Sequence, residues 1–245
     1  MVPTKKLIEN EIYINKITNL LNKLDIIPSE FNNYLLAFVH RSLVNEKPDL
    51  SAEHNERLEF LGDAVLELVI THKLFLDYPN KPEGDLTDYR SSIVKGKHLA
   101  NIAKTLGFNE YLILGKGEEL GGGRNNDYLL ANCVESFIGA IYLDLGYEEA
   151  QKFILKYIYS NLENIINNDL LKDYKSLLQE YTQRVFNITP EYRVLDESGL
   201  DHEKNYKSGV FLLNTIIGNG NGSSKKKSQE DAAKDAFLNK EEIKI

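Results

Sequence analysis

Acidic side chains recur at helical spacing within one largely apolar stretch of the sequence. When residues 54–69 are drawn as a helix at 100° per residue, the acids that share one arc of about 80° are Glu56, Glu59, Asp63 and Glu67. Apolar residues fill most of the remaining circumference, and such a helix is normally buried. Like charges this close repel unless a cation lies between them. The pattern favours a metal site, with a solvated acidic face as the alternative for this helix alone.

A second predicted helix, residues 128–147, supplies further oxygen ligands. Its apolar residues recur at i, i+4, i+7 and i+8. Asn132 and Glu135 lie on the opposite side, one turn apart, with Gly139 beneath them, where a small residue would let another backbone or a ligand come close. Each helix would then offer a pair of the hard oxygen donors that Mg²⁺ prefers: Glu59 with Asp63, and Asn132 with Glu135.

These two stretches carry a family resemblance. The run His54–Leu66 resembles the signature of the ribonuclease III family, and Leu129–Asp144 resembles its second acidic helix. The similarity continues through Pro82–Thr87 and Leu114–Glu119 and covers nearly the whole chain, from about Ile17 to Leu238. The resemblance implies an endoribonuclease that cuts double-stranded RNA by metal-assisted hydrolysis, leaving 5′-phosphate and 3′-hydroxyl ends.

The resemblance also implies roles for individual residues. The site would bind one or two Mg²⁺ ions, and Mn²⁺ is the expected substitute. The ligands would be Glu59, Asp63, Asn132 and Glu135. Of these, Asp63 and Glu135 would lie closest to the reacting phosphate. Glu56 and Glu83 are candidate accessory acids, and a solvated loop glutamate is the alternative for Glu83. The family forms homodimers through the signature helix, so Phe60 and Leu61 are candidate interface residues, with ordinary core residues as the alternative.

Asn132 departs from the family, which usually has Asp at this position. Its amide oxygen can still ligate Mg²⁺, but the side chain is neutral and its NH₂ group is a donor. We therefore expect an active enzyme that needs more Mg²⁺ than a relative with four acids. The alternative is a catalytically impaired protein that binds double-stranded RNA and keeps the fold.

Composition places the protein in a broad class. At 245 residues the chain is long enough for one or two domains with packed cores. It has no uninterrupted apolar run of 18 residues and no secretory signal at its N-terminus, so no membrane span is expected. Its single cysteine, Cys133, precludes an internal disulfide and is interpreted as a packing residue. These features fit a cytoplasmic protein that requires no small-molecule cofactor besides the metal.

The net charge of −8 is unevenly distributed along the chain. Residues 170–245 contain 12 basic and 12 acidic residues, so the whole excess of acid lies in the first 169 residues, where the metal site is expected. Local basic patches, rather than the net balance, must then provide affinity for RNA.

The periodicity predicts an all-α nuclease domain followed by a small α+β domain. The predicted limits are an N-terminal helical extension (1–15), a catalytic domain (16–164), a short linker (165–169) and an RNA-binding domain (170–241). In the catalytic domain we expect helices over residues 5–24, 30–40 (closed by His40-Arg41-Ser42), 54–78, 84–106 (opened by Asp85 and Thr87, closed by Gly107) and 128–164. The glycine-rich segment 115–126 reads as a mobile connector whose Lys116 and Arg124 are either phosphate contacts or without a ligand.

The C-terminal part reads as helix, three strands, helix. The first predicted helix has an apolar face that consists of Leu170, Tyr174, Leu177, Leu178, Tyr181 and Val185. The predicted strands that follow it are Glu191–Ser198, Tyr206–Asn214 and Thr215–Gly218. A glycine–serine–lysine segment then enters the last helix. This order resembles the double-stranded-RNA-binding domain, in which the helix N-terminus with Lys225, Lys226 and Lys227 would clamp phosphates. By the same resemblance, Ser176, Gln179 and Glu180 would face one minor groove of the RNA and His202 the next.

Overall fold

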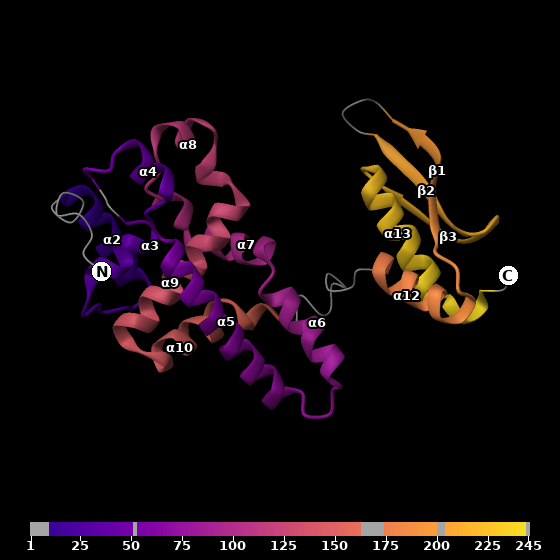
Figure 1. Ribbon diagram of the computed structural model, residues 1–245, viewed down its shortest axis with the longest axis horizontal. Coiled ribbons are helices and arrows are strands. Elements are labelled where there is room, and N and C mark those ends of the chain that lie inside the picture. Colours follow the sequence, from indigo (N-terminus) through magenta and orange to yellow (C-terminus); the bar gives the residue numbers. More distant parts are fainter. Residues whose placement is uncertain (1–9, 51–52, 163–173, 200–203, 244–245) are drawn as a thin grey trace. The chain divides into compact units, whose positions relative to one another are not determined.

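The computed structural model describes residues 10–50, 53–162, 174–199 and 204–243. Two compact units share the chain, residues 1–171 and residues 172–245 (Figure 1). Each unit has its own hydrophobic core. The expected linker, residues 165–169, and the first nine residues of the expected N-terminal extension lie outside the described residues. The boundary expected at residue 15 falls inside the first described helix, whose Ile17, Leu20 and Leu21 are buried in the first core.

The described part of the first unit consists of helices, short 3-10 turns and the segments that join them. Its elements are α2 (Glu11–Lys23), α3 (Phe31–Ala37), α4 (Arg41–Glu46), α5 (Glu56–Asp77), α6 (Glu83–Ile93), α7 (Gly96–Leu106), η1 (Phe108–Glu110), α8 (Lys116–Leu120), η2 (Gly123–Asn125), α9 (Asp127–Leu145), α10 (Tyr147–Tyr157) and η3 (Tyr159–Asn161). Helices α3, α5, α7 and α10 all pack against α9, which places α9 at the centre of the unit.

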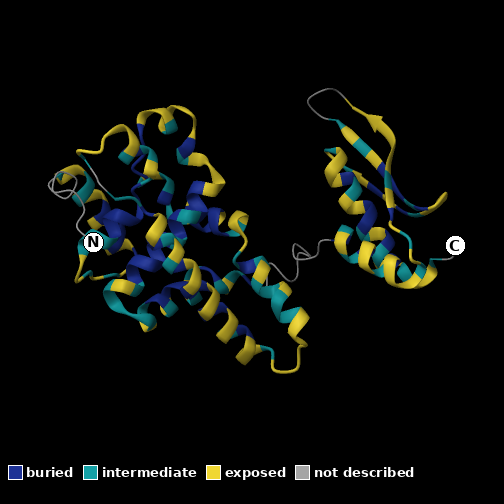
Figure 2. Ribbon diagram, in the orientation of Figure 1, coloured by how far each residue is buried: buried dark blue, intermediate teal, exposed yellow. Residues whose placement is uncertain are grey.

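Helix α9 is buried along most of its length (Figure 2). Among the described residues it is the one helix that is long and apolar enough, by length and composition, to cross a membrane, but 61% of that window is buried inside the protein. Around its Phe137 lie the rings of Tyr34, Phe38, Phe108 and Phe153, with centroids 5.0–5.8 Å away. This aromatic cluster, at the geometry that aromatic pairs prefer, fixes α9 within the core.

The C-terminal end of α9 also anchors α3. The Asp144 carboxylate accepts hydrogen bonds from the backbone N–H groups of Ser29 and Glu30 at 3.0 and 2.6 Å and from the Tyr34 hydroxyl at 2.9 Å. These backbone donors lie at the start of α3, where N–H groups have no partner within the helix. A carboxylate distant in sequence thus caps α3 and joins it to the central helix.

The helix expected over residues 84–106 is two helices, α6 and α7. The chain leaves helical geometry at Lys95 (φ −59°, ψ 131°) because α6 packs against α5 whereas α7 packs against α9. Helix α6 begins at Glu83 with Pro82 as its N-cap, so the expected cap at Asp85 and Thr87 is also wrong. Gly107 ends α7 in the left-handed region (φ 75°), as predicted.

Residues 40–42 begin a helix rather than closing one. Helix α3 ends at Ala37, and His40 is the N-cap of α4, where its Nδ1 accepts a hydrogen bond from the Ser42 N–H at 3.3 Å. Between the two helices, Val39 pairs with Ile113 in a parallel bridge. That long-range pairing ends α3 early, and the periodicity of the sequence does not reveal it.

The glycine-rich segment 115–126 has its own structure. It folds into α8 and η2, and the Glu46 carboxylate caps α8 by accepting from the N–H groups of Lys116 and Gly117 at 2.7 and 2.9 Å. The Arg124 guanidinium pairs with Glu119 and donates to the Asn109 carbonyl at 2.6 Å. Arg124 is therefore bound within the unit, unlike a residue of a mobile connector.

Helix α5 is not buried all round. Leu58, Val65, Leu66, Val69 and Ile70 are buried, but other large apolar side chains of the helix are exposed. Phe60 (81% exposed), Leu68 (58%) and Phe75 (68%) share one arc of about 80°, and Leu76 (58%) is exposed near the C-terminal end of the helix. The expectation that the apolar residues of this helix are buried within the unit is thus correct for only one side.

The second unit has the predicted α-β-β-β-α order. It comprises α12 (Tyr174–Phe186), β1 (Glu191–Ser198), β2 (Asn205–Leu212), β3 (Thr215–Gly222), α13 (Lys225–Leu238) and η4 (Lys240–Glu242). The strands form an antiparallel sheet in the order β1-β2-β3. On α12, Tyr174, Leu178 and Thr182 are buried, whereas Val185, which shares the face of Tyr174 and Leu178, is half exposed.

Strand β3 runs four residues further than predicted because its glycines accept close helix packing. A Cβ at Gly220 would lie 2.1 Å from the Ala232 nitrogen, and one at Gly218 would lie 2.7 Å from Ala236 Cβ. Helix α13 therefore lies directly on the strand. Its Asp231 and Asp235 accept hydrogen bonds from backbone N–H groups of β3 at 2.8 and 2.9 Å, so these donors of the edge strand are satisfied.

Candidate metal centre

The site begins with a backbone contact between α5 and α9. A Cβ at Gly62 would lie 1.7 Å from the Glu135 carbonyl oxygen, and one at Gly139 would lie 2.3 Å from the Leu58 carbonyl oxygen. Only hydrogen at both positions lets the two helices approach this closely. The sequence-based expectation of a close approach at Gly139 is confirmed. Gly62 was missed, although a lone glycine inside a long apolar helix signals such a contact.

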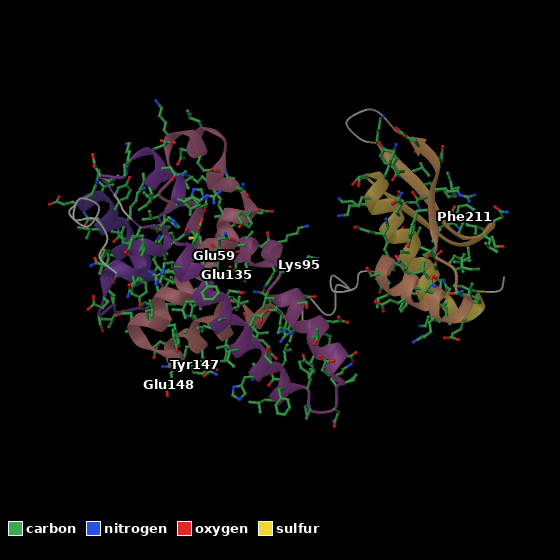
Figure 3. All side chains as sticks on the ribbon, viewed as in Figure 1. Glu59, Lys95, Glu135, Tyr147, Glu148 and Phe211 are labelled. Atoms are coloured by element: carbon green, nitrogen blue, oxygen red, sulfur yellow. The ribbon has the colours of Figure 1, made fainter. Side chains whose placement is uncertain are left out.

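This contact brings three of the predicted acids together. Burial, followed by the charges of Asp63 and Glu59, raises the pKa of Glu135 to about 8. Burial and the Glu56 charge raise the pKa of Glu59, and burial with Glu67 raises that of Asp63. Figure 3 shows Glu59 and Glu135 beside each other where the two helices pack. No cation contributes to these shifts among the described residues, so the carboxylates repel one another across the helix pair.

Asn132 belongs to the same group. Its side chain forms a hydrogen bond with the Glu59 carboxylate, which opposes the rise in the pKa of Glu59. Because a carboxylate can only accept, the Asn132 NH₂ group is the donor. The amide oxygen of Asn132 then remains available as a ligand.

The donor chemistry of these four residues fits Mg²⁺. Three carboxylates and one amide oxygen are the hard ligands that this ion takes, and it usually keeps several waters in addition. Within the described residues, however, no group of three or more His, Cys, Asp or Glu side chains is arranged so that it could hold a metal ion as it stands. A divalent cation bound between these acids would relieve their repulsion.

The two accessory acids differ in position. Glu56 lies next to the group, since its charge raises the pKa of Glu59, and it pairs with Arg41 at 3.5 Å and with His54 at 3.8 Å. Glu83 lies in the first turn of α6, accepts a hydrogen bond from the Thr87 hydroxyl at 2.8 Å and shifts the pKa of none of the three acids.

Phe60 and Leu61 occupy different environments on α5. The Phe60 side chain is 81% exposed, which excludes the alternative of an ordinary core residue, whereas Leu61 is half-buried. Phe60 thus begins the exposed apolar face of α5.

The predicted RNA-binding residues lie on two helices of the second unit. Ser176, Gln179 and Glu180 are exposed on α12. Lys225, Lys226 and Lys227 form the exposed first turn of α13, and the Ser224 hydroxyl caps it by accepting from the Lys227 N–H at 3.2 Å. His202 lies outside the described residues.

Comparisons with known proteins agree with this architecture. Residues 32–162 match the family model described as Ribonuclease-III-like, and residues 174–240 match the double-stranded RNA binding motif. Ribonuclease 3 of Borreliella burgdorferi is 41% identical over 94% of both chains, and that of Leptospira interrogans is 42% identical over 94% of this chain and 93% of its own. The nuclease domain of Campylobacter jejuni ribonuclease III is 36% identical, with a TM-score of 0.55 over 59% of this chain and 97% of its own.

A helical nuclease domain with packed acids, joined to a domain that binds duplex RNA, defines an endoribonuclease specific for double-stranded RNA. The chain belongs to the ribonuclease III family.

Proposed function

We propose that this enzyme hydrolyses both strands of duplex RNA at a site made by Glu59, Asp63, Asn132 and Glu135, leaving 5′-phosphate and 3′-hydroxyl ends. The observation that carries the proposal is the close packing of α5 on α9 at Gly62 and Gly139, which brings Glu135 within reach of the charges of Asp63 and Glu59. Acids so arranged destabilise the fold unless they bind cations, and perturbed acids gathered in this way are typical of functional sites.

The chain's own residues hold the site in position. Asp63, whose charge acts on Glu135 more strongly than that of Glu59, would bind the ions nearest the reacting phosphate together with Glu135, while Glu59 and Asn132 complete the set. When bound, one or two Mg²⁺ ions would polarise the scissile phosphate, activate a water and stabilise the leaving oxygen. Mn²⁺ has similar ligand preferences and is the proposed substitute. The hydrogen bond from Asn132 orients Glu59 before any ion arrives.

The second unit would hold the duplex. The free N–H groups and the three lysines at the start of α13 suit a phosphate backbone, and the exposed polar face of α12 suits a minor groove. We propose the same role for His202, and propose residues 16–164 and 170–241 as the limits of the two domains.

We propose a homodimer formed through the exposed apolar face of α5, in which Phe60 is a contact residue and Leu61 lies at the margin. An exposed row of large apolar side chains marks an interaction surface. A structure of the Campylobacter jejuni nuclease domain concerns a region involved in its dimer formation. Two protomers would bring two acid sites to one duplex, so that each cuts one strand.

The proposed substrates are precursors of ribosomal RNA and other structured transcripts, cut in the cytoplasm. Recognition of an RNA duplex by shape and backbone suits any transcript with a long stem. The relatives named Ribonuclease 3 align over nearly their whole length, which supports a shared role.

Cleavage of a long RNA duplex tests the proposal. The full chain and its Glu135→Gln variant are incubated with end-labelled duplex in Mg²⁺ and in chelator, and the product ends are determined by ligation and phosphatase treatment. We expect Mg²⁺-dependent cutting to 5′-phosphate ends by the wild type and a loss of at least about 100-fold in the variant. Binding of the duplex without any cutting in Mg²⁺ would instead establish the non-catalytic alternative.

A further inference from the structure

Arg41 is a cation whose backbone is fixed and whose charged end is exposed. It is the first residue of α4, directly after His40, and His40 Nδ1 lies 2.8 Å from the Ser42 hydroxyl. That hydroxyl in turn accepts from the Gly115 N–H at 2.9 Å. The network ties the start of α4 to the segment before α8, yet the Arg41 side chain is 65% exposed.

The Arg41 guanidinium lies beside the acid group without joining it. It is 3.5 Å from Glu56 Oε1, and Glu56 is the residue whose charge reaches Glu59. Arg41 itself shifts the pKa of none of Glu59, Asp63 and Glu135. Glu56 therefore stands between Arg41 and the proposed ligands.

A structural role for this ion pair is small. The partners are 65% and 46% exposed, and ion pairs exposed to this extent contribute little to stability. The single contact at 3.5 Å also leaves most of the five guanidinium donors of Arg41 uncommitted to Glu56.

The proposed reaction needs such a cation. RNA brings one negative charge per nucleotide to a surface that carries Glu56, Glu59, Asp63 and Glu135, and bound metal compensates only the charge at the scissile phosphate. Phosphates on either side still face Glu56. Arginine is well suited to them because its planar fork donates two parallel hydrogen bonds to phosphate oxygens.

We infer that Arg41 binds an RNA phosphate adjacent to the scissile one and positions the duplex over the acid group. In this role Arg41 exchanges its Glu56 contact for phosphate oxygens when RNA binds. It is a positioning and binding residue rather than a catalytic one, and the inference rests on the proposed function.

Steady-state cleavage by the full chain tests the inference with four proteins: wild type, Arg41→Ala, Arg41→Lys and the control Lys152→Ala. Lys152 is a matched control because it is 70% exposed and pairs with Glu149 on α10. Cleavage is measured at saturating Mg²⁺ over a range of KCl concentrations. Thermal unfolding checks each fold, and Arg41→Gln, which also removes the charge, replaces Arg41→Ala if that variant does not fold.

We expect Arg41→Ala to raise KM about tenfold with kcat within about twofold, as for the loss of one charged hydrogen-bonding contact. The slope of log(kcat/KM) against log[KCl] should become shallower by about 0.7–0.9, the amount for one phosphate contact. Arg41→Lys should keep the slope, and Lys152→Ala should change neither quantity.

The inference is overturned if Arg41→Ala lowers kcat at unchanged KM and slope, or if Arg41→Lys loses the slope as fully as Arg41→Ala. The first result would show that Arg41 acts on the acid site rather than on RNA binding. The second would show that its positive charge does not bind an RNA phosphate. The salt slope of RNA binding is also compared between Glu135→Gln and the double variant with Arg41→Ala. Because this comparison needs no cleavage, it separates failure of the Arg41 role from failure of the proposed hydrolysis.

Discussion

Asn132 donates a hydrogen bond from α9 to the Glu59 carboxylate on α5. An aspartate at position 132 would instead place a fourth negative charge against Glu59. The neutral side chain thus lowers the repulsion within the metal-free site while it removes one charge that would attract Mg²⁺. Both effects can be measured separately.

Asn132→Asp is expected to lower the Mg²⁺ concentration needed for half-maximal cleavage by about three- to tenfold, because an added carboxylate strengthens binding of a hard cation. The metal-free variant should unfold at a lower temperature than the metal-free wild type, since like charges at this spacing repel. Cleavage rate and thermal unfolding, each titrated with Mg²⁺, are the measurements. An unchanged Mg²⁺ requirement would remove Asn132 from the coordination shell.

The raised pKa of Glu135 predicts a pH-dependent stability of the metal-free protein. Its pKa is about 8 in the folded chain, against about 4.3 for an ordinary glutamate. Between these values the folded state binds more protons, so the free energy of unfolding falls as pH rises from about 4.3 to 8. Asp63 and Glu59, whose charges face Glu135, also have raised pKa values, and their ionisation likewise lowers the free energy of unfolding as pH rises.

Glu135→Gln should therefore raise the melting temperature of the metal-free chain at pH 8 and flatten its decline between pH 5 and 8. Glu148→Gln is the control, because Glu148 is exposed on α10 and labelled away from the site in Figure 3. Equal pH profiles for wild type and Glu135→Gln would show that ionisation of Glu135 does not destabilise the metal-free fold.

The contact at Gly62 predicts a large effect from one methyl group. Gly62→Ala places Cβ 1.7 Å from the Glu135 carbonyl oxygen, so α5 and α9 must separate. We expect a loss of more than about 2 kcal/mol in unfolding free energy, together with loss of cleavage, as for an overpacked core. In Gly84→Ala, a Cβ meets nothing within 4 Å on α6, and stability should rise by up to about 1 kcal/mol from helix propensity. Denaturant unfolding measures the free energy of unfolding of both variants. Similar values for the two would contradict the close contact of α5 with α9 at Gly62.

The exposed position of Phe60 predicts an effect on assembly. Phe60→Glu should shift the protein from dimer to monomer in sedimentation equilibrium and lower cleavage of both strands, because it places a charge in the proposed apolar interface. Ile27→Glu is the control, since Ile27 is 86% exposed outside α5. A dimer that persists in Phe60→Glu would place the interface elsewhere.

The lysines of α13 predict a salt-dependent effect on RNA binding. Replacing Lys225, Lys226 and Lys227 by glutamine should weaken duplex binding and make the slope of log Kd against log[KCl] shallower by about 2–3, at 0.7–0.9 per phosphate contact. Lys240→Gln, beyond the other end of α13, should leave the slope unchanged. Binding by fluorescence anisotropy at several salt concentrations measures both. A uniform slope across these variants would mean that the first turn does not contact phosphates.

The sequence by itself determined the features that depend on local periodicity and residue chemistry. The acids on two helices, the approach at Gly139 and the strand Glu191–Ser198 follow from repeats of 3.6 and 2 residues and from residue size. The α-β-β-β-α order follows in the same way, because each element carries its own pattern.

Only the tertiary structure decided where long-range packing overrides these patterns. Helix 84–106 breaks at Lys95 because its two halves pack on different partners, and the pairing of Val39 with Ile113 ends α3 before His40. The sequence alone likewise does not reveal that Phe60 is exposed or that Asn132 forms a hydrogen bond with Glu59. A sequence specifies which faces of a helix are apolar or charged, but the partner that covers each face is fixed only when distant segments pack together.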